Sequence, residues 1–111
     1  MTTQAFISGQ GISVDVNAAL AADAEAAVAA APGLRLVGWN IAESAGTPAV
    51  ATFRIMHGAT VAGGTVIAVI ELAADKSENF WCWPGIACPN GLTIDRVAGT
   101  ADVQLFHVTV I

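Results

Sequence analysis

Charged residues are scarce in this sequence: they make up 12% of its 111 residues, whereas soluble domains typically hold about 25%. Only four of them are basic, namely Arg35, Arg54, Lys76 and Arg96. These four are scattered singly, while proteins that neutralise nucleic-acid phosphates cluster their Lys and Arg. The net charge is −5 and the pI is near 4.5. The charge pattern therefore disfavours direct nucleic-acid binding.

Long apolar runs are also missing, although 55% of the residues are hydrophobic and the mean hydropathy is +0.65. The stretch that most resembles a membrane span, residues 26–34, is short and contains Pro32-Gly33, whereas a spanning helix needs about 20 apolar residues. No positively charged segment precedes an apolar one at the start of the sequence, so we expect no signal peptide. Intrinsically disordered chains are poor in apolar residues, so the high apolar content of this sequence excludes intrinsic disorder.

Residues that carry chemistry are few. The sequence holds two cysteines, Cys82 and Cys88, and two isolated histidines, His57 and His107. A structural zinc site needs four ligands in close pairs, and a disulfide needs an oxidising compartment, so we favour two buried free thiols. No nucleophile–base motif or phosphate-binding loop is present. We expect no catalytic residue, cofactor or metal, and no enzyme activity.

Turn residues recur at regular intervals and separate short runs rich in Val, Ile, Thr, Phe and Trp. Short strands spaced by about 8–12 residues are typical of an all-β sandwich or barrel. No gap is long enough for a linker, so we predict a single antiparallel β-sandwich domain over residues 1–111, with more than about 35% strand. The predicted strands are residues 12–16, 34–43, 49–57, 65–73, 79–83, 92–98 and 101–110.

The Ala-rich segment, residues 18–31, has two possible structures. Alanine is the best helix former, and Asn17 could cap a helix. Yet Ala22, Ala24 and Ala26 also alternate with Asp23 and Glu25, as in a strand. Residues 1–32 could therefore form an N-terminal arm or an extra strand.

Two predicted strands are apolar on both faces, which a sheet with one wet face would not show. In residues 102–110, Val103 and Leu105 lie on one face, and Phe106, Val108 and Val110 lie on the other. Residues 65–72 follow the same pattern, with Val66, Ala68, Ile70 and Leu72 on one face and Ile67 and Val69 on the other. Together with the low charge, this indicates that other copies or another protein cover part of the surface.

The sequence has no tyrosine, so its large aromatic side chains with a polar group are all tryptophans. We therefore consider the tryptophans as candidates for a functional surface. Trp81 and Trp83 share one face of a predicted strand, with Cys82 between them pointing to the other face. Such a pair could belong to the core, anchor a protein contact or stack against a sugar ring. The interface candidates are Trp39, Trp81, Trp83, Phe106, Val108 and Val110.

A family resemblance rests on structural glycines and turns between residues 33 and 111. The segments that carry it are Gly33–Trp39, Glu43-Ser44 with Thr47-Pro48-Ala49, Pro84-Gly85-Ile86 and Gly91–Ile94. In this pattern the sequence resembles small virion structural proteins of tailed bacteriophages. The resemblance implies a jelly-roll-like β-sandwich that attaches to the head or tail in multiple copies, and it favours an extended Ala-rich segment.

We therefore expect a capsid decoration protein that stabilises the exterior of a phage shell. The expected partners are other copies of the chain, with a trimer favoured by the threefold sites of capsid lattices, and a major capsid protein, but no nucleic acid and no membrane. The expected location is the virion surface after synthesis in the host cytoplasm. The alternative is a tail or fibre-tip sandwich that binds a host glycan or receptor through Trp81 and Trp83.

Overall fold

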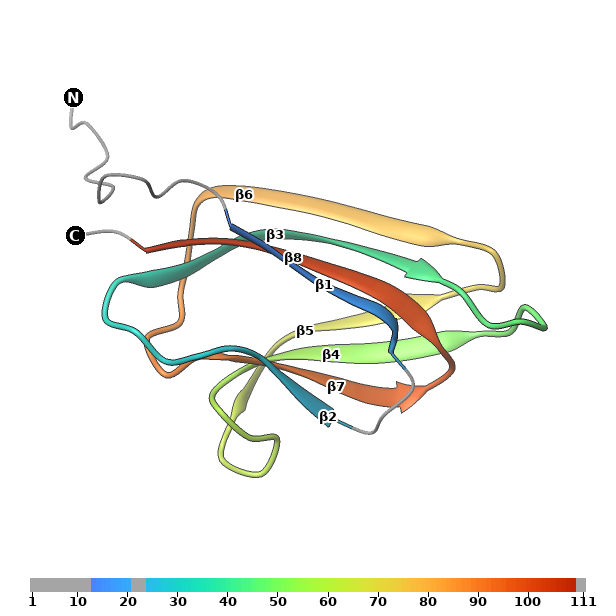
Figure 1. The fold of residues 1–111 in the computed structure, drawn as a ribbon, viewed down its shortest axis with the longest axis horizontal. Helices are drawn as coiled ribbons and strands as arrows, with labels where there is room; N and C mark the ends of the chain where they lie inside the picture. The colour runs from blue at the N-terminus through green and yellow to red at the C-terminus, as the bar shows by residue number, and fades with distance from the viewer. Residues whose placement is uncertain (1–12, 21–23, 110–111) are drawn as a thin grey trace.

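The computed structural model describes residues 13–20 and 24–109, and all regular structure within these ranges is β-strand (Figure 1). This confirms the predicted all-β class, and strands 34–43 and 92–98 have the predicted bounds. The strands are β1 (Ser13–Leu20), β2 (Ala24–Val28), β3 (Leu34–Glu43), β4 (Ala51–His57), β5 (Thr65–Leu72), β6 (Ser77–Ala87), β7 (Leu92–Ala98) and β8 (Ala101–Thr109).

The strands form two antiparallel sheets in the orders β1-β8-β3-β6 and β2-β7-β4-β5. The body of each sheet is three-stranded, β8-β3-β6 and β7-β4-β5, and β1 and β2 each add a strand at one edge. The pairs β4–β5, β3–β6, β2–β7 and β1–β8 are nested, as if one long hairpin had been rolled up. This is the strand order of an eight-stranded jelly roll, which confirms the jelly-roll-like prediction (Figure 1).

The core lies between the two sheets. Side chains alternate between the two faces of a strand, so β3 to β8 send about every second residue inward, apart from their bulges. Phe53, Ile94 and Leu105 are fully buried there. Burying each such side chain contributes about 1.5–3 kcal/mol, so the sandwich is held mainly by this layer. Its other members include Leu34, Leu36, Trp39, Ile41, Ile55, Ile70, Leu72, Leu92 and Val103.

The Ala-rich segment is extended in the part that the structure describes. Residues 18–20 continue β1, which pairs with β8, and residues 24–28 form β2, which pairs with β7. The free edges of β8 and β7 offer backbone hydrogen bonds along their whole length, and this pairing outweighs the helix propensity of alanine, because tertiary context routinely overrides propensity. Residues 1–12 and 21–23 lie outside the described ranges.

A bulge in β5 makes part of the predicted face assignment for residues 65–72 wrong. Ile55 pairs with Ala68 but Met56 pairs with Val66, so Ile67 is the extra residue. Ala68, Ile70 and Leu72 do share the core side, but Val66 is moved away from them and is 43% exposed. Ile67, expected on the opposite face, is half-buried against the core. One inserted residue reverses the facing of every residue before it.

An ion pair lies on the outer face of the β2-β7-β4-β5 sheet. Arg54 and Asp95 are register partners on β4 and β7, and Arg54 Nε donates to Asp95 Oδ2 over 2.7 Å. On the other side of Arg54, Val69 of β5 is 57% exposed. The described residues include no helix that is long and apolar enough to cross a membrane.

Candidate functional site

The described part of the chain contains no group of three or more His, Cys, Asp or Glu side chains placed to hold a metal ion. His57, at the end of β4, accepts a hydrogen bond at Nε2 from the backbone N–H of Asn90 over 3.2 Å. This contact ties the end of β4 to the turn between β6 and β7. The contact gives His57 a structural role.

Both cysteines are free thiols, as we favoured from the sequence, but only Cys88 is buried as expected, whereas Cys82 is half-buried. Cys88 is buried, with Sγ 3.3 Å from the carbonyl oxygen of Ile86. Cys82 points away from its neighbouring tryptophans, and its Sγ lies 3.7 Å from the carbonyl oxygen of Leu36. Burial raises the pKa of each thiol above its ordinary value, so both stay protonated at neutral pH.

Glu43 fixes one end of the sandwich electrostatically. Its carboxylate accepts hydrogen bonds from the backbone N–H groups of Asp75, at 2.8 Å, and Ala45, at 2.7 Å. These bonds favour the ionised form and lower the pKa of Glu43 below its ordinary value. The carboxylate thereby joins the end of β3 to the turn between β5 and β6.

Trp39 belongs to the core rather than to a surface. It is 5% exposed, and it stacks on Phe80 with ring centroids 4.4 Å apart and planes inclined by 28°. Its indole N–H donates to Glu78 Oε2 over 3.0 Å. A buried tryptophan whose indole N–H has a hydrogen-bond partner has a structural role. Trp39 therefore lies in the core, apart from the exposed Trp81 and Trp83.

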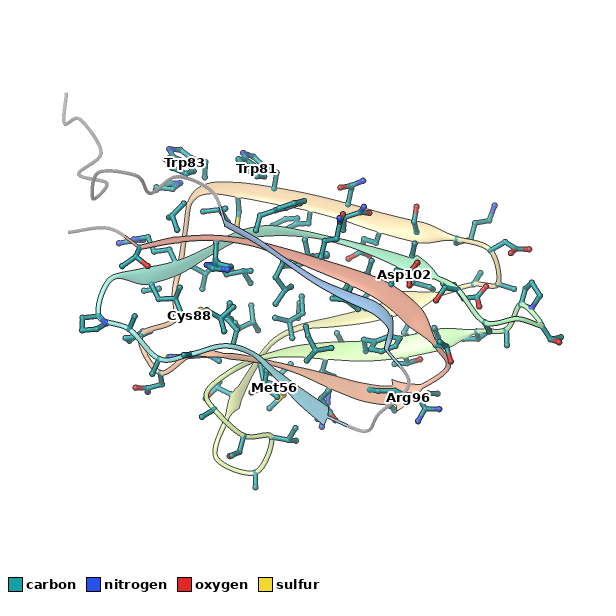
Figure 2. The ribbon with its side chains drawn as sticks, viewed as in Figure 1. Met56, Trp81, Trp83, Cys88, Arg96 and Asp102 are labelled. Atoms are coloured by element: carbon teal, nitrogen blue, oxygen red, sulfur yellow. The ribbon has the colours of Figure 1, made fainter. Side chains whose placement is uncertain are left out.

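Trp81 and Trp83 lie on the outer face of β6 and project away from the sandwich (Figure 2). Trp81 is 53% exposed and Trp83 is 41% exposed. β6 is an edge strand, so neighbouring side chains flank it on one side only. Neither residue is therefore part of the core, and the surface interpretations of this pair are the ones that remain.

Trp81 meets Phe106 across a glycine. Gly38 on β3 is the register partner of Trp81 on β6 and of Phe106 on β8. The two ring centroids are 6.0 Å apart and the planes are inclined by 57°. A Cβ atom at Gly38 would lie 2.3 Å from the carbonyl oxygen of Phe80 and 3.2 Å from the indole of Trp81. The absence of a side chain at Gly38 thus lets the two aromatic rings approach each other over the sheet.

A row of three side-chain amides runs beside this aromatic row. Asn40 is the register partner of both Asn79 on β6 and Gln104 on β8, and register partners share a face of the sheet. Asn40 Nδ2 donates to Gln104 Oε1 over 3.0 Å. The outer face of the β1-β8-β3-β6 sheet therefore presents an aromatic row, Trp81–Gly38–Phe106, beside an amide row, Asn79–Asn40–Gln104. We call these six residues the aromatic–amide face.

Sequence reasoning found the aromatic members of this face but missed Gly38 and the amides. An isolated glycine within a strand pattern indicates a close backbone approach, so the Gly38-Trp39 pair carried a usable signal. The amides carried none, because their alignment depends on the register of three strands. Of the other candidates, Val108 is buried and Val110 lies outside the described residues.

A second surface lies where β5 and β6, the two edge strands joined by the turn at residues 73–76, flank the same side of the sandwich. Phe80 and Ile86 face the core side of β6 but are 41% and 37% exposed. Ile67 and Ala68 on β5 are half-buried. Neither strand contains Lys or Arg, which natural proteins often use to protect an edge. We call these four residues the open side.

No protein-family model matches this chain, and neither a curated protein nor a solved structure matches it. The function is therefore argued from the geometry of these two surfaces.

Proposed function

We propose that this chain is a non-enzymatic structural protein of a tailed-phage virion, which decorates and stabilises the capsid exterior in many copies. The observation that carries the proposal is the open side. There the core of the sandwich reaches the surface along two edge strands that contain no Lys or Arg of their own. A jelly roll alone defines no function, so the fold supports the proposal only by being compatible with it.

An edge of this kind is stabilised when a partner covers it. Phe80 and Ile86 expose apolar area that a contact would remove from water, at about 25 cal/mol per Å². The free backbone groups of β5 and β6 can also pair with an extended segment of a partner. A protein that clamps shell subunits needs such contacts and no catalytic groups.

The charge and the sequence resemblance support the same role. A net charge of −5 suits the outside of a shell better than the inside, where the packaged genome attracts basic proteins. The segments between residues 33 and 111 resemble small virion proteins of tailed phages. The partners in this proposal are a major capsid protein and other copies of the chain, with a trimer as the expected assembly at threefold lattice sites.

Copy number tests the proposal. Particles are purified from the phage whose genome encodes this chain, and the chain is quantified by mass spectrometry against the major capsid protein. Decoration predicts a fixed ratio that scales with the number of shell subunits. A few copies per particle would place the chain in the tail or fibre, and absence from the particle would refute a virion role.

A variant pair links the copy number to the open side. Phe80→Ser removes a ring that is 41% exposed on the open side but also stacks on Trp39, so its unfolding free energy is measured alongside, and we expect far fewer chains per particle while the variant is folded. Val97→Ser is the matched control, because Val97 is 55% exposed but lies on β7, away from the open side. Circular dichroism is used to check that both variants are folded before they are added to particles that lack the chain. Equal occupancy by the two variants would contradict the docking role of the open side.

A further inference from the structure

We infer that the aromatic–amide face binds a neutral glycan. This inference goes beyond the proposed virion role and stands without it, because it concerns the outer face of one sheet rather than the open side. It rests on three neighbouring strands that each contribute one member of the aromatic row and one member of the amide row.

The aromatic row supplies a surface for stacking. The C–H groups on one face of a sugar ring carry partial positive charge and stack on the electron-rich face of an aromatic ring. Trp81 has more than half of its surface exposed, and the centroid of the Phe106 ring lies 6.0 Å from that of Trp81 with the planes inclined by 57°, so the two rings are neighbours on this face. A sugar stacked on the indole therefore also meets the Phe106 ring.

The amide row supplies hydrogen bonds at a matching distance. Asn79, Asn40 and Gln104 each lie two residues from the aromatic-row residue on the same strand, which is a separation of about 7 Å. A sugar ring stacked on Trp81 thus places its hydroxyl groups next to these side chains. An amide offers two N–H donors and a carbonyl acceptor, and a hydroxyl group both donates and accepts, so the two chemistries are complementary.

The amide row is partly organised before any ligand binds. The bond from Asn40 Nδ2 to Gln104 Oε1 orients both side chains. Among the described residues, it leaves the Asn40 carbonyl oxygen and the Gln104 NH₂ group for a ligand. Groups that are already oriented lose less entropy on binding. The pair therefore favours a ligand that can donate to the Asn40 carbonyl oxygen and accept from the neighbouring Gln104 NH₂ group.

The charge of the face selects a neutral ligand. Neither row contains a charged residue, and the chain as a whole carries −5. A nucleic acid or an acidic polysaccharide would therefore meet repulsion without any Lys or Arg on these rows to offset it. A neutral glycan meets stacking and hydrogen bonding without this cost.

The test is affinity electrophoresis of the full chain in native gels that contain hydroxyethylcellulose, galactomannan or a neutral bacterial O-polysaccharide. We expect at least one of these polysaccharides to retard the protein relative to a polysaccharide-free gel. Trp81→Ala removes the stacking surface and should weaken binding by at least about tenfold. The double change Asn40→Ala with Gln104→Ala should also reduce retardation, because it removes the hydrogen-bonding pair.

Val69→Ala is the matched control, because Val69 is 57% exposed on the outer face of the opposite sheet. It should be retarded like the parent protein. No retardation of the parent protein by any of the three polysaccharides would overturn the inference, as would equal retardation of Trp81→Ala. If Trp81→Ala lost binding to phage particles but kept its retardation, the face would be a protein-docking surface instead. Loss of retardation with normal particle occupancy would support the inference and leave the virion role intact.

Discussion

At the scale of single residues, Trp39 and Trp81 have opposite surroundings although both lie on the β3–β6 pair. Trp39 is 5% exposed with its N–H bonded to Glu78, whereas Trp81 is 53% exposed on the outer face. We predict that Trp39→Ala lowers the free energy of unfolding by about 3–5 kcal/mol and that Trp81→Ala lowers it by about 1 kcal/mol or less. Urea unfolding followed by circular dichroism measures both. Equal losses would place the two residues in the same core.

The ionisation of Glu43 makes part of the stability depend on pH. Its folded-state pKa lies below the ordinary value because the backbone N–H groups of Asp75 and Ala45 bind the carboxylate. A lowered folded-state pKa stabilises the fold above the unfolded-state value, and this contribution is lost as the pH falls through the folded-state pKa. We predict that Glu43→Gln is less stable than the parent at neutral pH and that the two converge in acid.

The measurement is the urea midpoint of both proteins at neutral pH and at several acidic values. Glu71→Gln is the control, because Glu71 lies exposed on β5, and it should shift the midpoint little at any of these values. A difference between Glu43→Gln and the parent that stayed constant with pH would show that the carboxylate charge contributes nothing.

At the scale of elements, the close approach of β3 and β6 at Gly38 shapes the aromatic–amide face. A Cβ atom there would lie 2.3 Å from the backbone oxygen of Phe80, which cannot move without breaking the pairing. We predict that Gly38→Ala costs about 1–3 kcal/mol, as overpacking typically does. Gly46→Ala is the control, because no atom lies within 4 Å of its Cβ position, and it should be near neutral. Thermal or urea unfolding distinguishes the two. Equal stability of both variants would contradict the close approach of β3 and β6 at Gly38.

Local pattern was sufficient to predict most strands, because alternation and turn residues are properties of short segments. It was insufficient at bulges such as Ile67, where one extra residue reverses which face of the sheet the preceding side chains occupy. The composition of the segment does not indicate such a bulge. The Ala-rich segment shows a second limit. Its extended form depends on the free edges of β7 and β8, which are distant in sequence.

The candidate surfaces, too, could be predicted only where they depend on local sequence pattern. The exposure of Trp81 and Trp83 could be proposed from their shared strand face. The burial of Trp39 could not, because it depends on Phe80 and Glu78 from another strand. The amide row depends on the register of β6, β3 and β8 together. The burial and the neighbours of residues that depend on pairing between distant strands therefore cannot be predicted from a single sequence.

At the scale of the whole molecule, the open side predicts self-association. Phe80 and Ile86 remain exposed on edge strands that lack Lys and Arg. We predict that the purified chain forms a defined oligomer, with a trimer expected, rather than a monomer of 11.2 kDa. Size-exclusion chromatography with light scattering gives the mass directly. A single 11.2 kDa species at high concentration would contradict self-association, and Phe80→Ser should shift an oligomer toward the monomer.

The most direct test of the central claim is cryo-electron microscopy of phage shells with and without the bound chain. If the chain decorates the capsid, added density is expected at repeated positions over the shell exterior. In this density the open side, with Phe80 and Ile86, faces the capsid subunits, and Trp81 faces outward. Sandwiches that contact the shell through the aromatic–amide face, or density confined to the tail, would contradict it.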